Sequence, residues 1–120
     1  MLDYILELTE KILSEMNKLS AKDKDLIQNH VSFALQQTKA HINSTRINGA
    51  DMSSTILSNI WLRTANNIKD INNQRVKQLV ETMKEKGKYW SDPDSYDPAQ
   101  FDTYNMRISQ VDSTLKEMCK

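Results

Sequence analysis

The chain has 120 residues, a length that suits one domain able to bury a core without disulfides or metals. Its 16 Lys and Arg balance its 16 Asp and Glu, so no strong overall field draws it to nucleic acid or anionic lipid. A single cysteine, Cys119, excludes an internal disulfide and favours a reducing compartment.

The first predicted helix covers residues 2–18. Its apolar side chains recur three and four positions apart, which places them on one helical face. Asp3, Glu7 and Glu10 interrupt these positions, whereas a signal peptide has a basic start and an uninterrupted apolar segment. No run in the sequence approaches the ~20 apolar residues of a membrane span. The sequence therefore predicts a cytoplasmic protein that does not associate with membranes.

A second predicted helix covers residues 21–47. Ser20 is positioned to start it, because its hydroxyl can accept a hydrogen bond from the backbone amide of Asp23. Asn48 and Gly49 follow, and both residue types tolerate the left-handed backbone that ends many helices. Short connections between amphipathic helices favour antiparallel neighbours.

The third predicted helix is the longest, over residues 54–86, with Asp51 or Ser53 as its N-cap. Its apolar residues keep a heptad-like spacing throughout. At ~1.5 Å per residue it would reach ~50 Å, well beyond its neighbours. Either the helix extends past the bundle, or it bends. The candidate place for a kink or a break is near Asn72, in the asparagine-rich stretch 66–74, because asparagine side chains compete for backbone hydrogen bonds.

The stretch Gly87–Tyr104 holds five of the eight aromatic residues, both prolines and four aspartates. Asp97 and Pro98 form the clearest helix start in the chain, an N-cap followed by a residue suited to the first helical position. A fourth helix is predicted from there to Met118. Residues 1–120 are therefore predicted to form a single all-α domain. It would be an up-down antiparallel four-helix bundle with a long third helix and an aromatic, acidic loop before the last helix.

The sequence offers little for catalysis or metal binding. His30 and His41, the two histidines, lie three turns or ~16 Å apart on one predicted helix, and neither follows an acid by three residues. The acidic segment Asp92–Asp97 lacks the glycine and glutamate that a calcium-binding loop of the EF-hand type requires. Two isolated glycines cannot build a phosphate-binding loop. We therefore expect a protein that is not an enzyme and has no metal or cofactor.

The best candidate for a binding surface is the corner where the basic third helix meets the aromatic loop. Tyr and Trp are favoured anchors at protein interfaces, and those of the loop lie outside the helical periodicity. The alternative is that they fold back to cap one end of the bundle. We expect an adaptor, inhibitor or assembly subunit that binds another protein through residues 84–96. The predicted contact residues are Lys84, Lys86, Lys88, Tyr89, Trp90 and Tyr96.

An alternative function is association with nucleic acid through the basic face of the third helix. Residues 63–88 carry seven basic side chains against three acidic ones. On a continuous helix several of them fall on one side, where they could contact phosphates. The chain lacks the basic excess that is usual for nucleic-acid-binding domains. The additional residues predicted for this face are Arg63, Lys69, Arg75 and Lys77. A homo-oligomer through the last two predicted helices is a third alternative.

Overall fold

A computed structural model describes residues 2–48, 54–86 and 101–118, which form α-helices and contain no strand. The helices are α1 (Leu2–Leu13), α2 (Ala21–Asn48), α3 (Thr55–Ile68), α4 (Gln74–Lys86) and α5 (Phe101–Met118). A short 3-10 helix, Met16–Lys18, follows α1, which ends earlier than predicted. The prediction of an all-α fold is confirmed for these residues.

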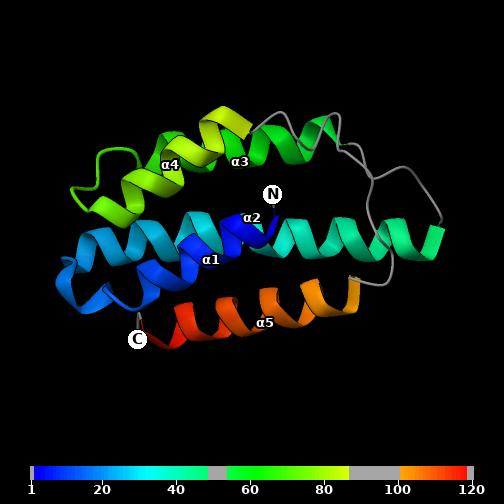
Figure 1. The fold of residues 1–120 in the computed structure, drawn as a ribbon, viewed down its shortest axis with the longest axis horizontal. Coiled ribbons are helices and arrows are strands. Elements are labelled where there is room, and N and C mark those ends of the chain that lie inside the picture. The colour runs from blue at the N-terminus through cyan, green and yellow to red at the C-terminus, as the bar shows by residue number, and fades with distance from the viewer. Residues whose placement is uncertain (1, 49–53, 87–100, 119–120) are drawn as a thin grey trace.

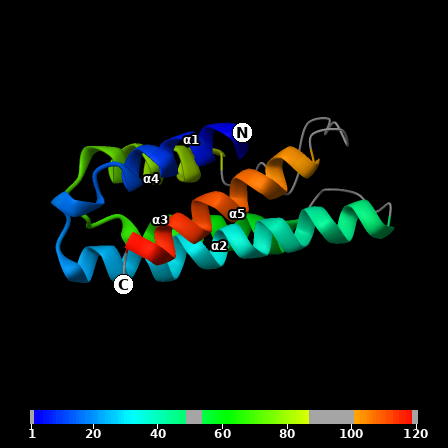
Figure 2. The ribbon, with the colours of Figure 1, turned by 90° about the horizontal axis from the view of Figure 1, so that it is seen from below.

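The described helices pack in a closed ring around one core (Figure 1). The helix α2 packs against α3 and α5, while α4 packs against α3 and α1, and α1 closes the ring against α5. Neighbouring helices run antiparallel except α1 and α5, which run in the same direction. Figure 2 shows α1 and α4 along one edge of the molecule and α2 along the opposite edge.

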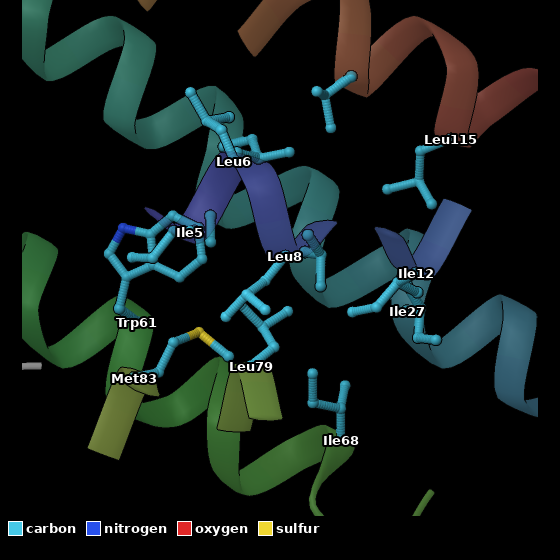
Figure 3. Packing of buried hydrophobic residues seen from close by; sticks show 14 of the residues in the cluster. Ile5, Leu6, Leu8, Ile12, Ile27, Trp61, Ile68, Leu79, Met83 and Leu115 are labelled. Atoms are coloured by element: carbon cyan, nitrogen blue, oxygen red, sulfur yellow. The ribbon is translucent and has the colours of Figure 1, made fainter. Parts of the chain in front are cut away.

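Apolar side chains from every described helix meet in this core (Figure 3). Trp61 of α3 is the largest of them and is only 1% exposed. Burying one large apolar side chain stabilises a fold by about 1.5–3 kcal/mol, so the shared core contributes to the stability of the ring. The side chains labelled in the close view are Ile5, Leu6, Leu8, Ile12, Ile27, Trp61, Ile68, Leu79, Met83 and Leu115.

The single long helix predicted over residues 54–86 is wrong, because α3 ends at Ile68 and α4 begins at Gln74. The two helices form an antiparallel hairpin (Figure 1). The interruption lies within the stretch 66–74, the candidate place for a kink or a break. Because this turn adds a helix to the ring, the first and last helices become parallel neighbours, and the described helices do not form a four-helix antiparallel bundle.

Asn73 explains why the second helix of the hairpin begins where it does. Its side-chain Oδ1 accepts hydrogen bonds from the amides of Arg75 at 2.9 Å and Val76 at 3.2 Å. These amides have no partner within the helix, so the asparagine side chain satisfies them. Ile71, in the turn itself, is buried with the core residues. Capping and burial together stabilise a turn where the apolar pattern alone indicated a continuous helix.

Serine side chains start two of the other helices. The amide of Asp23 donates to Ser20 Oγ at 3.1 Å, which confirms the predicted start of α2. The amide of Leu57 donates to Ser54 Oγ at 3.0 Å, so the N-cap of α3 is Ser54 and not one of the two earlier residues predicted. The predicted helix start at residues 97–98 lies outside the described residues.

Candidate interaction surfaces

The structure describes the helical end of the corner that was predicted to bind a partner. Lys84 is exposed on α4, and Lys86 is the last residue of that helix. Lys84 is therefore accessible near the end of α4, and the aromatic segment follows this helix in the sequence. The remaining residues predicted for this corner lie outside the described residues, and they are Lys88, Tyr89, Trp90 and Tyr96.

The basic residues predicted to contact nucleic acid are divided between α3, its turn and α4. Arg63 is exposed on α3, Lys69 is exposed in the turn, and Lys77 is exposed on α4. Because the helix is interrupted between Lys69 and Lys77, these residues do not share one helical face. On α4, the exposed Glu81 lies between Lys77 and Lys84 on the same side of the helix.

Arg75, another residue predicted for the basic face, contacts the segment that follows α1. Its Nε lies 3.9 Å from Oε1 of Glu15. Asn73 Nδ2 reaches the other carboxylate oxygen of Glu15 at 3.5 Å. Both partners of the ion pair are partly exposed, so the pair adds little to stability. It nevertheless holds a negative charge beside Arg75, which disfavours a phosphate at the same place.

Asp112 on α5 accepts hydrogen bonds from polar side chains of α2. Ser32 Oγ donates to one of its carboxylate oxygens, and Gln36 Nε2 donates to the other at 3.3 Å. Lys116 Nζ lies 3.1 Å from the same oxygen as the glutamine. The Asp112 side chain is 14% exposed, and hydrogen bonds to a charged acceptor are stronger than neutral ones. The cluster therefore joins α2 to α5 and occupies both oxygens of the carboxylate.

Beside this cluster, a polar groove of about 590 Å³ lies between α2 and α5. Lys39 from α2 and Ser109 from α5 both line it, and Lys39 Nζ donates to Ser109 Oγ at 2.7 Å. The two lysines that line the groove, Lys39 and Lys116, each contact a polar partner on α5. We call this the α2–α5 groove.

A second groove, of about 280 Å³, lies between α2 and α3 and is lined by four apolar residues and by Gln37, His41 and Ser54. Ala40 borders it on α2, and Ile56, Leu57 and Ile60 border it on α3. Ile56 is 75% exposed, and Phe33, two turns before Ala40 on α2, is 51% exposed. Ile56 lines the groove, and an exposed apolar side chain beside a groove is a candidate contact for another protein. We call this the α2–α3 groove.

Sequence reasoning did not single out Phe33, although a signal for it exists. The buried residues of α2 include Val31, Leu35 and Thr38, and Phe33 falls on the opposite side of the helix from them. The sequence gives a weaker indication that Ile56 is exposed, because Ile56 directly precedes the buried Leu57 near the start of α3. The packing of α3 and α5 on α2 leaves both side chains exposed.

Within the described part of the chain, no three or more His, Cys, Asp or Glu side chains lie together in a way that could hold a metal ion. His30 instead has its Nδ1 3.3 Å from Nδ2 of Asn67 on α3. Among the same residues, no helix has the length and apolar content needed to cross a membrane. No family model, curated protein or solved structure matches this chain, so function is inferred from its residues and geometry.

Proposed function

We propose that this protein is a small, non-enzymatic helical interaction protein that binds another protein through the corner at residues 84–96. The role would be that of an adaptor, an inhibitor or a subunit of an assembly. The observation that carries the proposal is the concentration of Tyr89, Trp90 and Tyr96 directly after the basic end of α4. The exposure of Lys84 at that end supports it.

In this proposal, the partner buries Trp90 and Tyr89, which supply most of the binding energy. The lysines before them and the aspartates after them carry opposite charges in a short stretch of chain. Such a pattern favours a partner with a matching arrangement of charges, and it acts on the rate of association more than on affinity. The corner would therefore combine an apolar anchor with charged surroundings.

A double variant tests the proposal. With Trp90→Ala and Tyr89→Ala, we expect a protein that copurifies with the wild-type chain from the native host to be absent. Far-UV circular dichroism should stay unchanged, because the two residues would contact the partner rather than the core. Met106→Ala is the matched control, since it removes an exposed apolar side chain from a surface that takes no part in either proposal. Unchanged copurification, or a drop in helicity in the double variant, would refute the proposal; the second result would indicate the end-cap role.

Association with nucleic acid is the second candidate, favoured by the exposure of Arg63, Lys69, Lys77 and Lys84. It predicts binding of DNA or RNA at low salt that weakens steeply as salt is added. The double variant Lys77→Ala with Lys84→Ala should weaken binding and lower the salt slope by about 0.9 for each phosphate that is no longer neutralised. Lys22→Ala, which removes an exposed lysine from the start of α2, is the control. If the wild-type chain does not bind at low salt, this candidate is eliminated.

A further inference from the structure

The outward face of α2 exposes no charged side chain between Asn29 and Ser44. This stretch runs along the edge of the molecule that lies opposite α1 and α4 (Figure 2). At ~1.5 Å per residue it is ~22 Å long. We call it the neutral face of α2. Its exposed residues are Asn29, Phe33, Gln36, Gln37, Ala40 and Ser44.

The neutral face differs from the rest of the described surface. Charged residues make up 27% of the chain, and each of the other four described helices exposes at least one. Examples are Glu7 on α1, Arg63 on α3, Lys77 on α4 and Lys116 on α5. Lys39 is the one Lys, Arg, Asp or Glu between residues 26 and 45, and it contacts Ser109 of α5. Exposed charge helps to keep proteins apart, so its absence beside an exposed phenylalanine marks a surface suited to association.

A face without charges does not repel a second copy of itself. A face rich in lysine or glutamate would repel a second copy, whereas the amides of Asn29, Gln36 and Gln37 can both donate and accept hydrogen bonds. A symmetric dimer brings the same patch of two chains together, and it requires this kind of self-complementarity. The chemistry of the face therefore favours a second copy of this chain over a strongly charged partner.

The spacing of Phe33 and Ala40 fits an antiparallel pairing of two α2 helices. The two residues are two turns, or ~10 Å, apart on the same face. A two-fold axis beside Gln36 and Gln37 places Phe33 of one chain opposite Ala40 of the other. Ala40 borders both the α2–α3 groove and the α2–α5 groove. Its small side chain would therefore lie where the large Phe33 ring of the second copy packs. Ile56 and Ile60 would then line the pocket that receives the ring.

We propose that two copies of this protein form a symmetric dimer in which the neutral faces of α2 pack antiparallel, with Phe33 of each chain seated on Ala40 of the other. The dimer would cover Phe33 and Ile56, two large apolar residues that are exposed in the single chain. This surface is separate from the corner at residues 84–96. The Trp90 variants of the functional test should therefore leave the dimer intact, so the two proposals fail independently.

Sedimentation equilibrium of the purified full chain, over a wide range of concentrations, tests the dimer. The wild-type chain should shift from monomer to dimer as concentration rises. Phe33→Glu should weaken association by at least about tenfold, because it places a charge against Ala40, Ile56 and Ile60 of the second copy. Met106→Glu is the matched control, since it puts the same charge on an apolar residue of α5 that is 57% exposed. Association of this variant should equal that of the wild type.

A charge exchange at Gln37 tests the position of the two-fold axis. Gln37→Glu and Gln37→Lys should each weaken the dimer, because like charges then meet near the axis. A mixture of the two variants should form a heterodimer, since opposite charges now meet there. A wild-type chain that stays monomeric at every concentration would overturn the proposal. A dimer that tolerates both Phe33→Glu and the Gln37 variants would also overturn it, since association would then use another surface.

Discussion

Thr38 connects two helices through one hydroxyl group. Its Oγ1 accepts a hydrogen bond from Trp61 Nε1 at 3.0 Å and donates to the carbonyl of Ala34 at 2.7 Å. Both Thr38 and Trp61 are buried, so water does not readily replace either partner. The hydroxyl therefore satisfies the indole N–H and fixes the orientation of the largest side chain in the core.

Thr38→Val should lower the free energy of unfolding by about 1–3 kcal/mol, because it leaves the buried indole N–H without an acceptor. Thr114→Val on α5 is the matched control. Thr114 donates to the Gln110 carbonyl at 2.9 Å in the same local pattern, but it is exposed. Its replacement should change stability by less than about 0.5 kcal/mol. Urea denaturation measures both effects.

A double-mutant cycle isolates the hydrogen bond itself. Trp61→Phe removes the N–H donor and also part of the buried ring. If the bond stabilises the fold, Thr38→Val should cost less in the Trp61→Phe background than in the wild type. Equal costs in the two backgrounds would mean that the bond contributes nothing and that the valine acts through packing alone.

At the scale of the element, hydrophobic spacing could not locate the end of α3. Ile68, Ile71 and Val76 continue the apolar pattern through the turn, and all three are buried. A pattern of apolar positions does not record the direction of the backbone. It therefore gives the same signal for a continuous helix and for a hairpin whose turn packs into the core. The asparagines indicated a weak region of the helix, but only the hydrogen bonds to Asn73 Oδ1 show that this residue caps α4.

Asn73→Ala should lower the free energy of unfolding by about 1 kcal/mol, because the amides of Arg75 and Val76 lose their acceptor. Asn73→Asp should retain most of the stability, since aspartate caps helices as well as asparagine does. Asn72→Ala is the control, because Asn72 is its exposed neighbour in the same turn. Thermal or urea denaturation compares the three variants. Equal decreases for the two alanine variants would show that the cap does not stabilise α4.

For the whole molecule, the sequence predicted what depends on local pattern and missed what depends on neighbours. The helical stripes and the Ser20 start were predictable, because each involves residues a few positions apart. The parallel contact of α1 with α5 was not, since it follows from the number of helices in the ring. The scarcity of charge around Lys39 is visible in the sequence. Which side of α2 faces outward depends on where α3 and α5 pack. The aromatic corner stays a prediction from the sequence.

A closed ring around one core should unfold as one unit, and Leu115→Ala tests this. Leu115 on α5 is fully buried, so its truncation should lower the free energy of unfolding by about 2–5 kcal/mol. In a Trp90→Phe background, Trp61 fluorescence reports on α3, which lies across the ring from α1 and α5. The fluorescence and the far-UV circular dichroism should shift together to lower urea.

Met106→Ala is the control for the cooperative unit, because it truncates an exposed apolar residue of the same helix. It should change stability by less than about 0.5 kcal/mol. Two separate transitions in the Leu115→Ala variant, with circular dichroism changing before Trp61 fluorescence, would contradict the expectation. In that case α5 would detach on its own, and the remaining helices would hold Trp61 without it. A single shared transition requires instead that the buried side chains of α5 stabilise the helices that lie across the ring from it.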